Sequence, residues 1–169
     1  VGTKSGGVSR YDQALDQFTN FNDVLRPDHK ASVIRITDIA EDEDGNIWIA
    51  TWGLGLFKLS HDYYKLEGVF LENKVIQEVC VDHFGNVWSI SNNYLHKFDP
   101  SENRMIDLKK DFGTGMALCF DDENKQLLIG ASKGLFKFDI DNYTLEEFSE
   151  SKRLQLERIN AISIDQSGR

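Results

Sequence analysis

The sequence predicts an all-β fold made of repeated four-stranded units, and three observations carry this prediction. Short β-rich runs alternate with turns that are rich in aspartate, glycine, asparagine and serine. One sequence pattern recurs about every 40 residues. No stretch holds a 3.6-residue apolar period over helical length, apart from a weak segment from Tyr11 to Phe18.

The repeat is clearest where an acidic turn precedes a tryptophan. Residues 42–48 read DEDGNIW and residues 82–88 read DHFGNVW, so Trp48 and Trp88 stand 40 residues apart. A third copy, DENKQLL at 122–128, lacks the glycine and the tryptophan, and a fourth begins at Asp165. The second half of the unit also repeats, with a basic residue at one recurring position: Arg10, Lys58, Lys97 and Lys137.

Each unit contains four short runs of strand character. In the second unit these runs are 36–40, 47–51, 56–59 and 65–70. A period of about 40 residues, with four strands per unit and recurring glycine and tryptophan, is typical of β-propeller blades. We therefore expect an arc of a larger propeller, with units at 1–35, 36–75, 76–115 and 116–158 and a partial strand unit at 159–169. The run 159–165 is expected to pair along one sheet edge.

The acidic turns have a structural explanation. In Asp-x-x-Gly-Asn the glycine supplies a positive φ and the aspartate accepts hydrogen bonds from the backbone ahead. A calcium loop would need further acidic ligands, and Asp44 is replaced by Phe84 and Asn124 in the other copies. The sequence therefore predicts structural turns rather than a metal site at Asp42 and Gly45, Asp82 and Gly85, and Asp165 and Gly168.

Composition excludes several classes of function. A net charge of −9 over 169 residues disfavours nucleic acid as a partner, because phosphates select basic surfaces. No apolar run approaches the roughly 20 residues that span a bilayer, so we expect no membrane insertion by this segment. There is no glycine-rich phosphate loop, and the four histidines fall in different phases of the repeat: His29, His61, His83 and His96. We expect no catalytic residue, no metal and no cofactor in this segment.

The positions of the two cysteines within the repeat indicate whether they can form a disulfide. Cys80 lies two residues before Asp82, whereas Cys119 lies three residues before Asp122. Side chains alternate across a strand, so the two cysteines are expected on opposite faces of equivalent strands, as buried free thiols rather than a disulfide. Free thiols of this kind fit both a cytoplasmic and a periplasmic protein.

The repeat resembles the two-component regulator propeller repeat. The resemblance is carried by ITDIAEDEDGNIWIAT at 36–51 with GLFKL at 55–59, by VGTKSGGVSRYD at 1–12 and by IGASKGLF at 129–136. It implies an extracytoplasmic, periplasmic sensor region of an inner-membrane hybrid two-component system of the Bacteroides type. The parent protein would then carry histidine kinase activity, and the ligand would be a glycan or another small polar molecule.

Three functions remain open at this point. The first is a non-catalytic ligand-sensing segment whose partners are an oligosaccharide and the rest of the propeller or a second copy. The second is a propeller enzyme of lyase or glycosidase type, and the third is a protein-binding or dimerisation scaffold. For a ligand site we expect the loop face opposite the acidic turns, where an aromatic ring stands near amide and basic groups that suit a sugar: Trp52, Asn92, Asn93, Lys133 and Arg35. For Trp52, packing against a neighbouring blade is the alternative.

Overall fold

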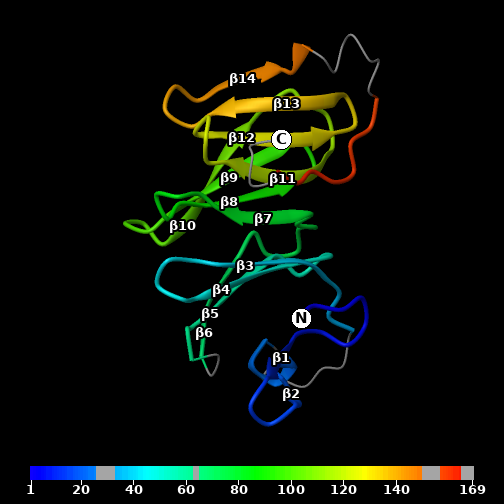
Figure 1. Ribbon diagram of the computed structural model, residues 1–169, viewed down its shortest axis with the longest axis vertical. Coiled ribbons are helices and arrows are strands. Elements are labelled where there is room, and N and C mark those ends of the chain that lie inside the picture. The colour runs from blue at the N-terminus through cyan, green and yellow to red at the C-terminus, as the bar shows by residue number, and fades with distance from the viewer. Residues whose placement is uncertain (26–32, 63–64, 150–156, 165–169) are drawn as a thin grey trace. The chain divides into compact units, whose positions relative to one another are not determined.

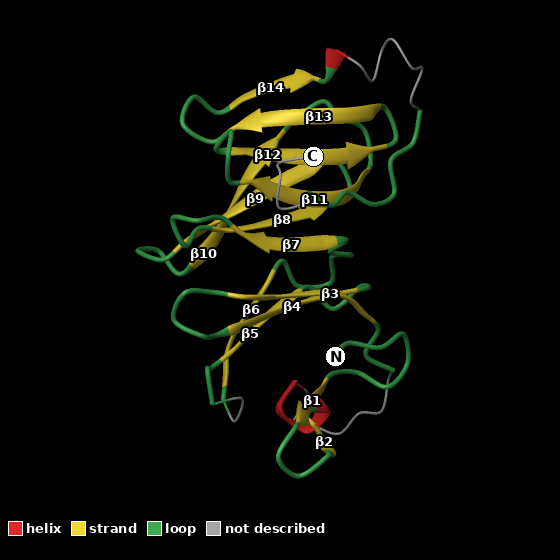
Figure 2. Ribbon diagram, in the orientation of Figure 1, coloured by secondary structure: helices red, strands yellow, loops and turns green. Residues whose placement is uncertain are grey.

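The computed structural model describes residues 1–25, 33–62, 65–149 and 157–164, and nearly all of their secondary structure is strand (Figure 1, Figure 2). Three four-stranded antiparallel sheets follow one another along the chain, after one two-stranded sheet. In each four-stranded sheet the strand order follows the sequence order, which is the meander of a propeller blade. The predicted fold class is confirmed: the chain is all-β and consists of propeller blades. It divides into two compact units, Val1–Val79 and Cys80–Arg169, which are described separately.

The first unit contains the two-stranded sheet and the first full blade. Its elements are β1 (Ser9–Asp12), β2 (Gln17–Asn20), the short helix α1 (Asn22–Leu25), β3 (Ile36–Glu41), β4 (Ile47–Thr51), β5 (Leu56–Leu59) and β6 (Leu66–Phe70). The weak helical segment of the sequence is a β-hairpin, in which Tyr11 pairs with Phe18. The prediction of a possible helix there was wrong because Asp12 caps a tight turn, where it accepts hydrogen bonds from the backbone N–H groups of Ala14 and Leu15.

The other two blades follow. The second blade has β7 (Glu78–Val81), which contains the boundary between the units, β8 (Val87–Ser91), β9 (Tyr94–Asp99) and β10 (Arg104–Lys109). The third blade has β11 (Gly115–Asp121), β12 (Gln126–Ala131), β13 (Gly134–Asp139) and β14 (Thr144–Glu147). Each blade has apolar side chains on both of its faces, because successive strand residues point to opposite sides of the sheet.

Each unit has its own apolar core. In the first unit, Ile47, Ile49, Phe57 and Leu59 from the blade are buried with Val8, Phe21, Leu25 and Ile34. In the second unit, the core contains Trp88, Ile90 and Leu95 from one blade and Leu127, Ile129, Phe136 and Phe138 from the next. Burial of these large side chains removes apolar surface from water and is the main stabilising term of the fold.

One recurring cross-strand pair joins a tryptophan to a lysine. Trp48 pairs with Lys58 and Trp88 pairs with Lys97. The lysine Nζ atoms lie 5.5 Å and 5.2 Å from the respective ring centroids, within the range of a cation–π interaction. The third blade has Leu128 paired with Lys137, so its register keeps the basic residue although the indole is lost.

The third acidic turn differs from the sequence alignment by one residue. Asp121, and not Asp122, accepts the hydrogen bonds of the turn, from the backbone and side chain of Asn124 and from the side chain of Gln126. The loop has one extra residue, and Lys125 adopts the positive φ of 52° that a glycine supplies elsewhere. Both cysteines therefore stand two residues before a turn aspartate.

This register corrects the interpretation of the cysteines. Cys80 and Cys119 share one repeat phase, so the prediction that they point to opposite strand faces was wrong. Both are free thiols, and both are half-buried rather than buried. Burial, followed by the charge of Asp121, raises the pKa of Cys119, which disfavours its reactive thiolate form.

The strand expected at 159–165 is not formed in its described part. Residues 157–164 belong to no strand. The Ile159 N–H donates a hydrogen bond to the Ala131 carbonyl oxygen at 3.1 Å, and Ile159 packs against Gly130. Asp165 and Gly168 lie outside the described residues.

Candidate functional site

The acidic turns are built around one carboxylate each. In the first blade the Asp42 carboxylate accepts hydrogen bonds from the backbone of Asp44 and Asn46, at 3.1 Å and 2.8 Å, and from the Trp48 indole Nε1–H at 2.9 Å. In the second blade the Asp82 carboxylate accepts the equivalent hydrogen bonds, from the backbone of Phe84 and Asn86 and from the Trp88 indole Nε1–H at 2.8 Å. Gly45 and Gly85 have φ values of 78° and 77°. The oxygens are thus directed at N–H groups of the chain itself.

Hydrogen bonds also set the ionisation of this carboxylate. Burial opposes the charge on Asp42, but the hydrogen bonds from Trp48 and Asn46 and the positive charge of Lys58 outweigh it, so the pKa is held below its usual range. Such a carboxylate is a fixed acceptor and not a general acid. Among the described residues, no group of three metal-ligating side chains could hold a metal ion.

Replacing this carboxylate is expected to destabilise the first unit. In Asp42→Ala the buried Trp48 indole N–H loses its acceptor, so the free energy of unfolding is expected to fall by about 1–2 kcal/mol, as measured by urea denaturation. Asp44→Ala, in the same turn but exposed, is the matched control and is expected to change stability by less than about 0.5 kcal/mol. Equal losses in the two variants would contradict this assignment.

Two of the predicted ligand-binding residues lie together in the first unit. The Arg35 guanidinium carbon lies 4.7 Å from the ring centroid of Trp52. The Trp52 backbone N–H donates to the Arg35 carbonyl oxygen at 2.9 Å, and Trp52 forms a β-bridge with Val75. The Trp52 side chain is 53% exposed. The result is an aromatic and cationic surface at the turn between β4 and β5.

The other three predicted residues lie in the second unit. Asn92 and Asn93 form the two-residue turn between β8 and β9, where Asn92 has a φ of 52°. Lys133 lies in the equivalent turn between β12 and β13 and forms an ion pair with Asp111. The first residue of β11 and the residue before it contact both turns: the Gly115 N–H donates to the Asn92 carbonyl oxygen, and the Ser132 N–H donates to the Thr114 carbonyl oxygen. The two turns are thus neighbours within the second unit.

An acidic pair that sequence reasoning missed lies beside the first blade. Asp38 on β3 accepts a hydrogen bond from the Val79 backbone N–H at 2.9 Å, and the Glu78 carboxyl is hydrogen-bonded to Asp38. Burial, the negative charge of Asp38 and this hydrogen bond raise the pKa of Glu78 to about 8. Both acids stand four residues before a turn aspartate, a coincidence of repeat phase that could have been found in the sequence.

A second group missed from the sequence is a serine, histidine and aspartate chain in the second blade. His96 Nδ1 lies 2.7 Å from Asp107 Oδ1, and His96 Nε2 lies 2.6 Å from Ser91 Oγ. A carboxylate only accepts, so Nδ1–H donates to Asp107 and the Ser91 hydroxyl donates to Nε2. This is the connectivity of a serine nucleophile and its base.

The surroundings of this chain are those of a core. Ser91 is 2% exposed and His96 is fully buried. Ser89 pairs with His96, where the other blades have Ile49 with Phe57 and Ile129 with Phe136. The Ser89 hydroxyl is buried without a hydrogen-bond partner in the described structure. The second blade therefore has a polar layer where the other two blades have an apolar one. Because the Ser91 side chain is buried in this layer, a substrate could not reach its hydroxyl group.

The blades, their acidic turns and their tryptophan–lysine pairs define the class of the protein as a β-propeller segment. Residues 31–53 match the family model described as two component regulator propeller. The resemblance drawn from the sequence is thereby confirmed, and 31–53 is a repeat of that family. No match was found among curated protein sequences.

Solved structures share the fold of the chain. The extracellular domain of BT4673 from B. thetaiotaomicron, assigned as a one component system, has a TM-score of 0.76 and 23% identity. The extracellular domain of BT3049 from the same organism, assigned as a hybrid two component system, has a TM-score of 0.75 and 19% identity. Both alignments cover 99% of this chain but only 23% and 22% of the other chain.

The same fold also occurs in an enzyme. Hydrazine synthase from Kuenenia stuttgartiensis matches with a TM-score of 0.65 and 12% identity, over 79% of this chain and 40% of that chain. The fold alone therefore does not separate a sensor from an enzyme. No described helix is long and apolar enough to cross a membrane.

Proposed function

We propose that this chain is a ligand-sensing segment of the extracytoplasmic, periplasmic region of a hybrid two-component sensor. The observation that carries the proposal is the family match at 31–53, because the matched repeat contains both Arg35 and Trp52. The parent protein would carry the histidine kinase, and the rest of its propeller would complete the sensing region. The segment itself binds without catalysis.

The proposed ligand is a small glycan. A half-exposed indole beside a guanidinium offers a flat apolar face together with hydrogen-bond donors, which suits the apolar face and the hydroxyl groups of a sugar ring. Within the second unit, Asn92, Asn93 and Lys133 would form a separate polar surface with amide and ammonium groups. The proposal needs no metal and no cofactor.

The test compares two exposed aromatic residues. In the parent sensor, Trp52→Ala is expected to weaken the response to an oligosaccharide mixture at least tenfold. The reason is that the substitution removes the indole face on which the sugar ring would stack. Phe84→Ala is the matched control, because Phe84 is 55% exposed but lies in an acidic turn of the second unit, and it should leave the response unchanged. A wild-type response in Trp52→Ala, or equal losses in both variants, would contradict the glycan site.

The serine, histidine and aspartate chain favours an enzyme as the second candidate. A nucleophile must reach its substrate, however, and Ser91 is buried. We therefore expect a fluorophosphonate probe to leave Ser91 unlabelled in the folded chain, as read by mass spectrometry. Labelling of Ser91 that disappears in His96→Ala would instead make the segment a hydrolase.

An exposed apolar hairpin favours a protein-binding scaffold as the third candidate. Tyr11, Leu15 and Phe18 are all exposed on the β1–β2 hairpin, and the Tyr11 and Phe18 rings lie 5.1 Å apart. Exposed apolar clusters often mark contact surfaces. This small surface is compatible with a sensor that also contacts a neighbouring part of its own propeller.

A further inference from the structure

The segment that joins β6 to β7 runs alongside the turn that carries Trp52. This segment comprises residues 71–77, and we call it the strap. Val75 forms a β-bridge with Trp52, and the Ile76 N–H donates to the Thr51 carbonyl oxygen at 3.0 Å. The Ile76 side chain is fully buried. The strap therefore holds the backbone of the Trp52 turn from one side.

The strap begins in an unfavourable backbone conformation. Leu71 and Asn73 have φ values of 51° and 62°, in the left-handed region that residues other than glycine rarely adopt. The Gly55 N–H donates to the Lys74 carbonyl oxygen at 3.1 Å, which connects this part of the strap to the turn between β4 and β5. Because the conformation costs free energy, contacts further along the strap must keep it in place.

The far end of the strap is fixed to β3 by a pair of acids. The Thr37 hydroxyl donates to the Ile76 carbonyl oxygen at 2.6 Å, and the Val79 N–H donates to the Asp38 carboxylate at 2.9 Å. The Glu78 carboxyl is hydrogen-bonded to the same carboxylate. Since an ionised carboxylate only accepts, Glu78 must carry the proton and donate it to Asp38. We call Asp38 and Glu78 the acid latch.

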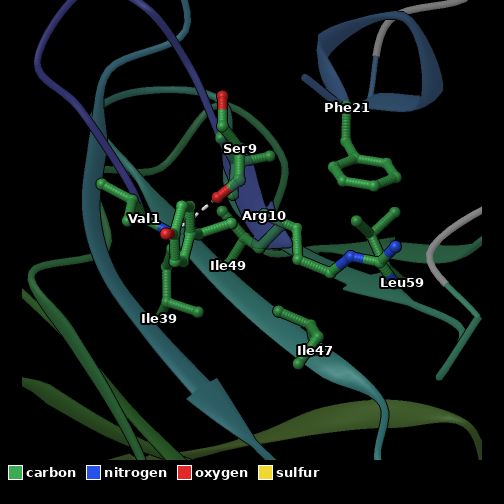
Figure 3. Close-up of a pocket in the computed structure, with 10 residues that line it drawn as sticks. Val1, Ser9, Arg10, Phe21, Ile39, Ile47, Ile49 and Leu59 are labelled. Carbon is green, nitrogen blue, oxygen red and sulfur yellow. Dashed lines mark hydrogen bonds between the residues drawn. The ribbon is translucent and has the colours of Figure 1, made fainter. Parts of the chain in front are cut away.

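The acid latch lies on the face of β3 that is turned away from the apolar side of the first unit. Figure 3 shows Ile39 at a pocket of about 280 Å³, which Ile49 and Arg10 also line. Successive residues of a strand point to opposite faces, so Asp38 points away from this pocket. The Arg10 guanidinium is thus on the other side of the strand from the latch.

The surroundings of the latch oppose a second negative charge. Both carboxyl groups are half-buried, and neither β4 nor β8, the sheet neighbours of β3 and β7, contains a charged residue. Burial first, and then the charge of Asp38, oppose the ionisation of Glu78. The ionisable residues beside and on β3, in the strap and on β7 are Arg35, Asp38, Glu41, Glu72, Lys74, Glu78 and Cys80.

We propose that the acid latch is a proton-dependent device that fixes the strap and, through the strap, the Trp52 turn. With the latch closed, the strap pairs with Trp52, whose ring lies against the Arg35 guanidinium. When Glu78 loses its proton to solvent, two carboxylates face each other, so they separate and the strap is released. The consequence for ligand sensing, a Trp52 surface that is formed in the protonated state, rests on the proposed function.

The first experiment measures opening of the strap by hydrogen exchange and mass spectrometry. After correction for intrinsic exchange rates, protection of the strap is expected to fall at least about thirtyfold between pH 5 and pH 8, because opening releases the Glu78 proton. Low concentrations of urea should not change this protection, whereas they should lower that of the β4–β5 ladder, since opening the strap exposes little surface. Equal protection and equal urea dependence of strap and ladder at every pH would overturn the proposal.

Three variants assign the effect to the latch. Glu78→Gln still donates to Asp38 but cannot ionise, so its strap should stay protected at every pH. Asp38→Ala removes the acceptor of both hydrogen bonds, so its strap should be open throughout. Glu72→Gln is the matched control, because Glu72 is an exposed acid of the strap outside the latch, and it should keep the wild-type profile. A pH-dependent strap in Glu78→Gln, or a flat profile in Glu72→Gln, would overturn the proposal.

The second experiment follows Trp52 itself by fluorine NMR of the chain labelled with 5-fluorotryptophan. The Trp52 resonance, assigned by its loss in Trp52→Phe, is expected to move between pH 5 and pH 8 in the wild type and to stay fixed in Glu78→Gln. A Trp52 resonance that does not respond to pH while the strap opens would overturn control of the Trp52 turn by the latch. Neither experiment uses a ligand, so their failure is distinct from failure of the oligosaccharide response.

Discussion

Replacement of Trp88 by alanine is expected to lower the free energy of unfolding by about 4 kcal/mol. Trp88 is fully buried in the core of the second unit, and its indole N–H donates to Asp82 at 2.8 Å. The substitution removes a large apolar surface, leaves a cavity between two blades and deprives the Asp82 carboxylate of a donor. Urea denaturation followed by circular dichroism would measure the loss.

The control for this prediction is Trp52, a tryptophan whose side chain is exposed rather than buried. Trp52 is 53% exposed, so Trp52→Ala is expected to change the free energy of unfolding by about 1 kcal/mol or less. Trp88→Phe should recover part of the loss, because it fills much of the cavity but cannot donate to Asp82. A similar loss for Trp52→Ala and Trp88→Ala would show that repeat phase does not separate core from loop tryptophans.

Stability is expected to fall as the pH rises from 5 to 8, because of Glu78. Its folded-state pKa is raised to about 8 from an ordinary value of 4.5. Between these values the folded chain binds more protons than the unfolded chain, so each rise in pH favours unfolding. The stabilisation is therefore complete below about pH 4.5 and is lost as the pH rises through 8. After allowance for solvent screening of a partly exposed group, we expect a loss of about 2–3 kcal/mol.

The measurement is a series of urea denaturations at pH values from 5 to 8. Glu78→Gln keeps a hydrogen-bond donor towards Asp38 but has no proton to lose, so its stability should be nearly independent of pH in this range. Asp38→Asn should also flatten the profile, because it removes the charge that opposes ionisation of Glu78. A wild-type profile as flat as that of Glu78→Gln would contradict the assignment.

The blade architecture could be predicted from the sequence because each repeat contains its own strand-forming and turn-forming residues. The runs 47–51 and 56–59 coincide with β4 and β5, since β-branched and aromatic residues there are bounded by turn residues with few alternatives. The third acidic turn was misplaced by one residue, because a turn needs an acceptor and a positive φ rather than a fixed sequence. That shift also assigned Cys119 to the wrong strand face, because a register error of one residue turns a side chain to the opposite face of the sheet.

The candidate site was less accessible to prediction than the fold. Arg35 and Trp52 are brought together because neighbouring segments of one blade carry them. The contacts of His96 with Ser91 and Asp107 depend on cross-strand register, which separates the partners by 5 and 11 residues. The raised pKa of Glu78 depends on burial next to Asp38, 40 residues earlier in the chain. Such pairings become visible only when the strands are placed beside one another.

The third acidic turn has a consequence for how such proteins are found in genomes. It keeps its conformation with Asp121 as acceptor and Lys125 at positive φ, although the glycine and tryptophan of the signature are gone. The family model matches 31–53, whereas the described residues contain three four-stranded blades. In this chain the blade is thus formed even where the sequence motif is incomplete. A count of propeller blades based on this motif alone would therefore miss the third blade of this chain, and we expect the same in other proteins whose repeats lack the glycine and the tryptophan.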